Sequence, residues 1–438
     1  MKILVANIGS TSLKWRLFDF SNTPERMLHK GGFERVTDYA QAIENCLAEL
    51  KNAGAIQNEN ELAAVGFKTV LAKNVSGCAR LDERVLKAMA DYSGLAPAHN
   101  PPYITGIRLF AKRMPDTPLV GLFETAFYQF APEAMMRYAV PQKWHDAGIR
   151  RFGFHGASHK FIAERSAEML GREDVARRAQ NLYVDGGKTK ISGKPFRVIS
   201  CHLGGSSSVT GILNGAAIGT SMGMSPQSGL PQNNRVGDLD AEAIPYAVKA
   251  LGISIEEAQR QLSKESGLKG LSGVSNDIRE VQEAAAKGNA AAKMAIDVFV
   301  ASARHWIGSY FFELNGADAI VFTAGIGENR PELREAICAN LDNLGIILDS
   351  EKNGSAKARE SIISAPDSRV KILVIPTNEE LVVAREVKRF LENPNSEIRS
   401  PKENRKTDSE TRISNFGNSD AGFRPSHFSI ASQPSTIQ

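Results

Sequence analysis

A short sequence pattern, in which a segment rich in glycine and hydroxyl residues separates two apolar runs, occurs twice in this sequence, 195 residues apart. This repeat constrains the fold more than any other feature. Residues 2–6 form an apolar run, the segment NIGSTSLK follows, and a second apolar run ends near residue 18. This order predicts a strand, a tight turn and an antiparallel strand. The pattern returns over residues 197–213, where the turn reads HLGGSSS. Such a repeat favours an internal duplication that produces two similar domains facing a shared cleft.

Strands and helices alternate along the rest of the chain, which indicates an α/β architecture. Further strands are expected at residues 319–323 and 370–375, and a glycine-rich turn at residues 325–329. Helices are expected over residues 38–52, 80–92, 153–171, 240–262, 278–314 and 379–390. After about residue 392 the sequence is rich in Ser, Asn and Pro with balanced charges, so we expect a disordered tail there.

Length and composition narrow the class of protein. A chain of 438 residues is too long for one hydrophobic core and indicates two large domains. Its net charge of +4 is small for this length and does not predict nucleic-acid or membrane binding. The four cysteines lie far apart with no CxxC pair, which argues against a disulfide framework and fits a reducing cytoplasm. No apolar run approaches about 18 residues, and the N-terminus does not resemble a signal peptide.

The two repeated turns carry the chemistry of phosphate binding. Small residues let backbone N–H groups approach a phosphate, and hydroxyls and Lys14 can donate to it. Asn7 lies at a strand end, where its amide oxygen could face a metal or a metal-bound water. A third segment, FTAGIGEN at residues 322–329, runs from a buried strand into a glycine-rich turn, where nucleotides sit in α/β folds. Plain hairpins and a plain strand-to-helix connection remain the alternatives.

Three further segments hold candidate side chains with two interpretations each. In RRFGFHGASH, His155 and His159 are four residues apart and would share a face of a helix. A zinc site is disfavoured because no third ligand lies nearby. The two remaining interpretations are a core or capping role for one histidine and a phosphate contact by His155. In NNRVGDLD, Arg235 is either a solvated surface charge or an arginine finger. In PTNEELVVARE, Glu379 either complements a helix N-terminus or holds Mg²⁺ through water.

Taken together, these segments indicate a protein family more specifically than any one of them does alone. NIGSTSLK, LAPAHNPP, FETAF, RRFGFHGASH, HLGGSSS, SGVSNDIR, FTAGIGEN and PTNEEL occur here in the order seen in acetate kinase and its propionate-kinase relatives. The chain therefore resembles this family from residue 1 to about residue 390. The resemblance implies the duplicated ribonuclease H-like fold of actin, Hsp70 and sugar kinases, two domains around a central cleft. It implies reversible, ATP-dependent phosphorylation of a short-chain carboxylic acid to its acyl phosphate.

The same resemblance implies domains, ligands and assembly. An acid-kinase domain would span residues 1–145, completed by a helix at about 379–391, and a nucleotide-binding domain would span residues 146–378, before the tail at 392–438. The implied ligands are ATP or ADP, the carboxylic acid and Mg²⁺ or Mn²⁺. A cytoplasmic homodimer is the expected state, with no nucleic-acid or membrane partner.

Residue roles carry over from the matching motifs. The metal positions are Asn7 and Glu379, and the catalytic positions are Glu124, His155 and Arg235. The acid would be bound by Lys68, Val70, Ala98, Phe154 and Pro226. The nucleotide would be bound by Lys14, His202, Leu203, Gly204, Gly205, Ser206, Asp277, Ile278, Arg279, Gly325, Ile326, Gly327, Glu328 and Asn329.

Several positions depart from the family pattern. The family reads GHRVVHGG where this chain reads GFKTVLAK, so Lys68 replaces an arginine, keeping the charge but losing the planar fork. Glu124 replaces an aspartate and extends its carboxylate by one methylene. The asparagine of HLGNG falls on Gly205, which removes a phosphate contact. Ala98 replaces a leucine, which should widen the acyl pocket and admit longer acids, and the TR of the family's GTR segment becomes Asn234 and Arg235.

These departures set the expected mechanism and its alternatives. A carboxylate is ionised at neutral pH, so catalysis needs mainly alignment and charge neutralisation, with Lys68 orienting the acid and His155 and Arg235 meeting the equatorial oxygens. We expect a slow enzyme rather than an inactive one, and expect Lys68→Arg to raise the rate on acetate. The alternatives are a kinase of the same fold with a changed donor or acceptor, such as pyrophosphate, and a weakly active nucleotide-binding regulatory paralogue.

Overall fold

The computed structural model describes residues 1–97 and 99–393, and two six-stranded sheets organise them. The first sheet has the order β3-β2-β1-β4-β6-β5. Its strands are β1 (Lys2–Ile8), β2 (Ser12–Asp19), β3 (Arg26–Glu34), β4 (Leu62–Thr69), β5 (Cys78–Arg80) and β6 (Leu119–Phe123). Strands β1, β2 and β3 form an antiparallel meander, β1, β4 and β6 run parallel, and β5 is antiparallel to β6.

The second sheet repeats this topology strand for strand. Its order is β11-β12-β10-β7-β8-β9, again an antiparallel meander joined to parallel strands with an antiparallel strand at the far edge. Its strands are β7 (Arg197–Leu203), β8 (Ser207–Leu213), β9 (Ala216–Thr220), β10 (Ala319–Thr323), β11 (Ser361–Ile362) and β12 (Lys371–Val374). The duplicated α/β fold predicted from the two similar turns is confirmed, because those turns open equivalent strand pairs in the two sheets.

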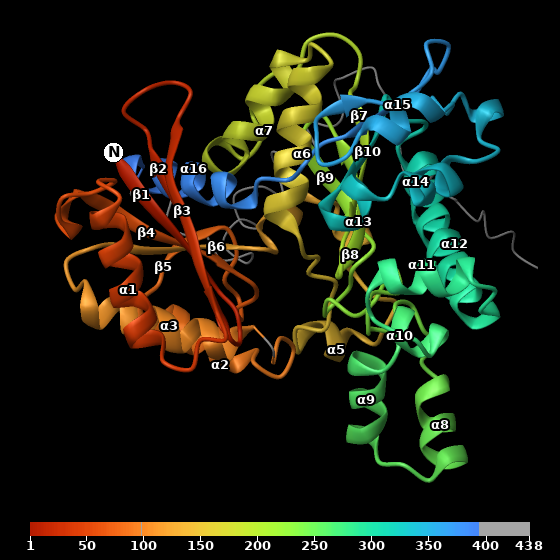
Figure 1. The fold of residues 1–438 in the computed structure, drawn as a ribbon, viewed down its shortest axis with the longest axis horizontal. Coiled ribbons are helices and arrows are strands. Elements are labelled where there is room, and N and C mark those ends of the chain that lie inside the picture. The colour runs from red at the N-terminus through yellow and green to blue at the C-terminus, as the bar shows by residue number, and fades with distance from the viewer. Residues whose placement is uncertain (98, 394–438) are drawn as a thin grey trace, which may run out of the picture. The chain divides into compact units, whose positions relative to one another are not determined.

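Helices cover the sheets and fill the connections between strands (Figure 1). In the first half they are α1 (Tyr39–Asn52), α2 (Glu83–Asp91), α3 (Asn100–Arg113), α4 (Glu133–Met136), α5 (Gln142–Asp146), α6 (Gly156–Met169) and α7 (Glu173–Asp185). In the second half they are α8 (Ala243–Leu251), α9 (Ile255–Lys264), α10 (Gly267–Ser272), α11 (Ile278–Ala286), α12 (Ala290–Glu313), α13 (Ala324–Asn329), α14 (Pro331–Cys338), α15 (Ser350–Ser355) and α16 (Glu379–Glu392).

The last helix, α16, returns to the first sheet. It packs against β1, β4 and β6, and Figure 1 shows it in blue beside the red strands of the N-terminal half. A Cβ added at Gly66 on β4 would lie 3.0 Å from Val387 and 3.2 Å from Val383, so glycine lets the helix lie close to the strand. This packing brings the first residue of α16 to the end of a sheet whose strands lie more than 250 positions earlier in the chain.

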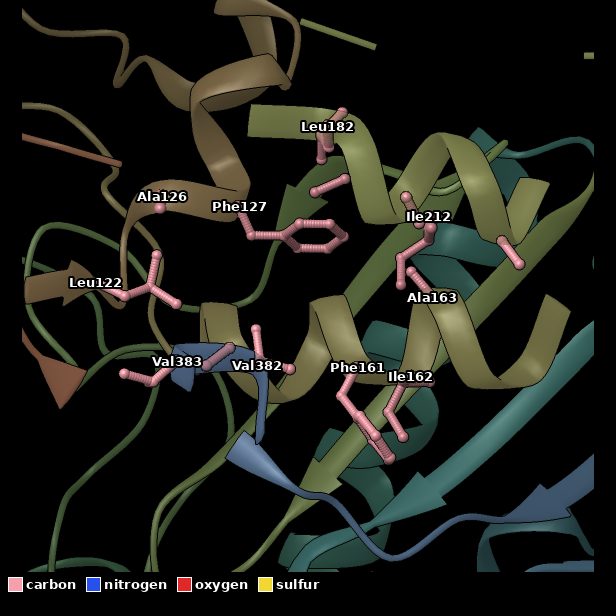
Figure 2. Close-up of a cluster of buried hydrophobic side chains, with 14 of the residues drawn as sticks. Leu122, Ala126, Phe127, Phe161, Ile162, Ala163, Leu182, Ile212, Val382 and Val383 are labelled. Atoms are coloured by element: carbon pink, nitrogen blue, oxygen red, sulfur yellow. The ribbon is translucent and has the colours of Figure 1, made fainter. Parts of the chain in front are cut away.

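One buried apolar cluster joins the two halves of the chain. It includes Val382 and Val383 of α16, Leu122 of β6, and residues from the second sheet such as Ile212 of β8. Figure 2 shows Phe161, Ile162 and Ala163 of α6 between these groups, with Leu182 of α7 nearby. Because this core is continuous, all the described residues belong to one compact unit. The boundary between domains at residues 145 and 146 stays a prediction.

Some expected elements differ in their bounds. The helix expected at 240–262 is two helices, because Gly252 takes the left-handed conformation (φ 63°) after α8 and Ser254 caps α9. The helix expected at 278–314 is also two, since Gly288 has φ 90° and Asn289 caps α12. The turn expected at 325–329 is wrong: α13 begins directly after β10. The predicted tail lies outside the described residues from 394 on, and no helix within the described ranges is long and apolar enough to cross a membrane.

Candidate functional site

A lysine between two carboxylates forms the centre of the candidate site. Strands β4 and β6 are parallel neighbours, so Lys68 near the end of one and Glu124 just after the other meet at the same edge. The Lys68 ammonium lies 3.3 Å from the Glu124 carboxylate and also forms a short ion pair with Glu379, the first residue of α16. The side chains of Glu124 and Glu379 are only 6% and 12% exposed. Three segments far apart in sequence therefore place three charges together.

Burial and proximity shift the pKa values in this cluster. Burial raises the pKa of Glu124 to about 7, and the negative charge of Glu379 adds to this, although Lys68 opposes it. For Lys68, burial alone would lower the pKa, but the carboxylates of Glu379 and Glu124 raise it well above its ordinary value. Burial would raise the pKa of Glu379, but Lys68 and His202 beside it lower it. The cluster therefore holds its cation firmly and carries a fully ionised Glu379 at neutral pH.

The oxygen atoms at this edge suit a hard divalent cation. One oxygen of the Glu124 carboxylate is buried and accepts no hydrogen bond of normal geometry among the described residues. Tyr103 donates its hydroxyl to Oδ1 of Asn7 at 2.8 Å, and the same tyrosine lies close enough to Lys68, Glu124 and Glu379 to interact electrostatically. Mg²⁺ prefers one or two carboxylates supplemented by phosphate and water oxygens. The residues at this edge fit that requirement.

A cluster of three histidines lies at the start of α6. His155 precedes the helix with φ 60°, and its Nδ1 lies 2.7 Å from the Ser208 hydroxyl. Its ring stacks on that of His202, with centroids 4.0 Å apart. His159 is fully buried, and its two ring nitrogens contact Ser200 and Ser208 at 2.8 Å each. His159 therefore has the core role, and the ring of His155 is left as the candidate for ligand contact.

Burial keeps these histidines neutral. Burial lowers the pKa of His155 well below its ordinary value, and His202, His159, Lys68 and Arg235 lower it further. Burial lowers the pKa of His202 to about 4. The close approach of α6 to Glu124 depends on Gly156, whose N–H donates to the Glu124 carbonyl at 3.0 Å, and where a Cβ would lie 2.1 Å from that oxygen. The glycine thus holds His155 and Glu124 on adjacent backbone segments.

Arg235 is held by polar groups of neighbouring loops. Its Nη1 donates to Oε1 of Gln232 at 3.2 Å and lies 3.5 Å from both the Ser206 hydroxyl and the Pro226 carbonyl. None of these partners is a carboxylate, so the guanidinium charge is oriented without being neutralised. Such a group can stabilise additional negative charge when a phosphoryl group arrives.

Two of the residues expected to line the acid pocket are brought together. Phe154 is buried in a small apolar cluster with Leu71 and Met222, and Val70 packs against it. Tyr92, Leu95 and Phe152 also contact this cluster and were not predicted from the sequence. Pro226 lies beside Arg235 through its carbonyl. Ala98 lies outside the described residues.

A separate cavity of about 470 Å³ lies in the C-terminal half. Most of its lining matches the nucleotide-binding prediction: Gly205, Asp277, Ile278, Arg279, Gly325, Ile326 and Asn329. Its remaining lining residues, Asn233 and Arg330, were missed. The sequence did carry a signal, because Asn233 lies in the segment already selected for Arg235 and Arg330 directly follows FTAGIGEN.

Other residues predicted to bind nucleotide do not line this cavity. Leu203 and Gly327 are buried, Leu203 in the core and Gly327 against Phe322 and Cys201. His202 lies near the end of β7, and Gly204 and Ser206 lie in the loop after it. Their hydrogen bonds join them to Ser158, Ser207 and Gln232, respectively. The Glu328 carboxylate accepts from the Thr377 N–H at 3.2 Å. Lys14 is exposed and paired with Glu34 at 2.9 Å, because β2 and β3 place these side chains on the same strand pair.

Known proteins resemble the chain over nearly all of the described range. The model of the acetokinase family matches residues 30–385. The acetate kinase of Pseudothermotoga lettingae is 39% identical over 425 residues, which cover 91% of this chain and 100% of that protein. The acetate kinase of Methanosarcina thermophila is 39% identical over 417 residues, covering 90% and 97%.

Solved structures give the same result. The acetate kinase of Porphyromonas gingivalis superposes with a TM-score of 0.78 at 32% identity, covering 89% of this chain and 99% of that one. A propionate kinase from Francisella tularensis superposes with a TM-score of 0.74 at 33% identity, covering 88% and 98%.

Proposed function

The chain belongs to the acetokinase family, and on that premise we propose that it transfers the γ-phosphoryl group of ATP to the carboxylate of acetate or propionate, reversibly and in line. One observation supports this most directly. A cationic lysine, two buried carboxylates, a neutral histidine and an unneutralised arginine come together from segments spread over the whole chain. Such a set orients a carboxylate and receives a phosphoryl group without a strong general base.

Each side chain has a distinct task in this proposal. The carboxylate of the acid is the nucleophile and is ionised at neutral pH, so Lys68 has only to orient it. Arg235, oriented by Gln232 and Ser206, meets the equatorial oxygens of the phosphoryl group as charge develops. The neutral ring of His155 donates a hydrogen bond there, with Ser208 and the stacked ring of His202 fixing its plane. The apolar cluster around Phe154 and Val70 excludes water from the acid's alkyl group.

The metal site belongs to the same proposal. Glu124 and Glu379, with Asn7 beside them, would hold Mg²⁺ or Mn²⁺. A bound divalent ion supplies neutralisation of charge on the phosphate oxygens. Lys68 lies between the two carboxylates, so its ammonium offsets part of their negative charge.

The nucleotide would lie in the cavity formed by the loop at Gly205, the start of α11 and helix α13. Asp277 caps α11 by accepting from the Arg279 N–H at 2.9 Å, and the two side chains form an ion pair. This fixes the Asp277–Arg279 segment on one wall of the cavity. Lys14, on β2 just after the first repeated turn, would reach the phosphates only after leaving Glu34.

The assembly and location follow the family expectation. Helix α8 is largely apolar, yet none of its residues is buried, and Tyr246 and Leu251 are 75% and 65% exposed. Phe312 of α12 is 86% exposed, and Met294 and Val298 of the same helix are exposed too. Exposed apolar faces of this kind are typical of protein–protein interfaces, so a homodimer formed through them is part of the proposal. A cytoplasmic location is supported by four free cysteines among the described residues.

The decisive experiment is an acid panel. Carboxylates of two to five carbons are offered with ATP and Mg²⁺, and the acyl phosphate is trapped as its hydroxamate. We expect turnover on acetate and propionate, and the longer acids test the wider acyl pocket expected from the sequence. Absence of turnover on every acid would reject the proposal, and a parallel donor panel that includes pyrophosphate identifies a changed donor.

A further inference from the structure

Two loops of the nucleotide cavity meet at a residue that has no side chain. Gly205 lies in the HLGGSSS loop, and Asn233 lies in the loop that carries Arg235. Both line the cavity. The Asn233 N–H donates to the Gly205 carbonyl at 3.1 Å, which joins the two loops. A Cβ added at Gly205 would lie 3.0 Å from Nδ2 of Asn233 and 3.5 Å from its Cγ. The Asn233 amide therefore occupies the space into which a side chain at position 205 would extend.

The backbone around Asn233 is fixed, but its amide is not engaged. Its carbonyl accepts from the Lys269 N–H at 2.9 Å, and the preceding Gln232 accepts from the Ser206 hydroxyl at 2.8 Å. Within the described ranges, the Asn233 side chain makes no hydrogen bond to another residue. An amide with two free donors on a fixed backbone, in the wall of a cavity that also presents Arg279 and Arg330, suits an anionic oxygen.

The sequence supports the same interpretation. The asparagine of the family's HLGNG segment falls on Gly205, and the glycine of its GTR segment falls on Asn233. Asparagine and glycine have thus changed places between two loops that touch. The contact at 3.0 Å leaves room for one amide at this point without displacement, and this chain supplies it from the second loop.

We propose that Asn233 is a nucleotide-binding residue, whose side-chain amide donates a hydrogen bond to a phosphate oxygen of the bound nucleoside di- or triphosphate and replaces the contact that Gly205 cannot make. This inference deepens the proposed function and rests on it only for the identity of the nucleotide. The amide of Asn233 would thus restore the phosphate contact that the sequence alone predicts to be lost at Gly205.

The test measures nucleotide binding directly, without the acid. Titration calorimetry of the full chain with ADP and Mg²⁺ is compared with titration by adenosine, which has no phosphate. Asn233→Ala should weaken ADP binding about tenfold, as expected for loss of one hydrogen bond to a charged group, and leave adenosine binding unchanged. Asn233→Asp should weaken ADP binding more, because it replaces a donor by a negative charge. Asn343→Ala, an exposed asparagine outside the cavity wall, is the matched control.

A reciprocal exchange makes the test specific. Gly205→Asn alone should weaken ADP binding because the new side chain meets the Asn233 amide, and Asn233→Gly alone should weaken it by removing the donor. The double variant Gly205→Asn with Asn233→Gly should recover ADP affinity to within about threefold of the original chain, with thermal unfolding confirming that each variant is folded.

The outcomes separate this inference from the proposed function. The inference is overturned if Asn233→Ala leaves ADP affinity unchanged, if it weakens adenosine equally, if the double variant is no better than the worse single one, or if the unaltered chain binds no ADP. Intact ADP binding that responds to Asn233 as described, together with no turnover on any acid, would reject the acid-kinase proposal and retain the inference.

Discussion

The side chains of Lys68 and Glu124 differ in length from the family's residues in opposite directions, so each change compensates for the other. Relative to the arginine and aspartate that the family pattern implies, the cation is one bond shorter and the carboxylate one methylene longer, about 1.5 Å. The two groups still meet, with 3.3 Å between the ammonium and the carboxylate, and Glu379 lies on the other side. We therefore expect Lys68→Arg alone to lower the rate on acetate, which reverses the expectation drawn from the sequence.

The magnitude follows from the space around the ammonium. The Lys68 side chain is only 23% exposed and its ammonium lies between the carboxylates of Glu124 and Glu379. Inserting a longer side chain between these two groups should cost about 1–3 kcal/mol. That cost corresponds to a fall of roughly 5- to 150-fold in kcat/KM for acetate. Glu124→Asp alone should cost a similar amount, because retracting the carboxylate by about 1.5 Å takes it beyond ion-pair distance.

The double variant decides the question. Lys68→Arg with Glu124→Asp should restore kcat/KM to within about threefold of the original chain, giving a coupling energy of about 2–6 kcal/mol between the two positions, close to the sum of the two single costs. The assay is hydroxamate trapping over a range of acetate concentrations, with ADP affinity and thermal unfolding measured on each variant. Additive losses in the double variant, or a gain from Lys68→Arg alone, would refute the reasoning.

Three other predictions test separate parts of the structure. Arg235→Ala should lower kcat by about 10³ while leaving ADP affinity within a few-fold, since its guanidinium contacts no carboxylate among residues 1–97 and 99–393. An equal fall in kcat for Gln232→Ala would contradict a direct role of Arg235. Burial lowers the pKa of His202 to about 4 in the folded chain, below its ordinary value of about 6.5, so the unfolded chain binds a proton more readily and the free energy of unfolding falls as pH drops from about 6.5 toward 4, by up to about 3 kcal/mol. In urea unfolding at pH 7.5 and pH 5, His202→Asn should lose less unfolding free energy between the two pH values than the original chain. Equal losses in the two proteins would contradict this prediction. Tyr246→Glu should convert a dimer to a monomer in light scattering, because it places a charge on the exposed apolar face of α8; Lys249→Glu, on the same helix, is the control for charge alone.

Local patterns were sufficient for the repeated architecture. The strand, turn and strand around NIGSTSLK and HLGGSSS could be predicted because apolar runs and glycine-rich turns act over a few residues. Helices such as α1, α6 and α16 followed for the same reason. The boundaries were weaker: Gly252 and Gly288 end helices through their own backbone conformation, whereas the short helix α13 forms although its sequence contains two glycines.

The order of the family's segments along the chain determined by itself which chemistry to expect and most of the residues to consider. Only the tertiary structure decided how they meet, because Lys68 and Glu379 are 311 positions apart and their contact depends on the packing of α16 against β4. It also decided that Leu203 and Gly327 face inward, and that Asn233 lies over Gly205. The sequence shows each substitution only as the loss or gain of one chemical group. Whether one substitution compensates for another depends on the distance between the two side chains, and packing sets that distance when the segments are remote in sequence.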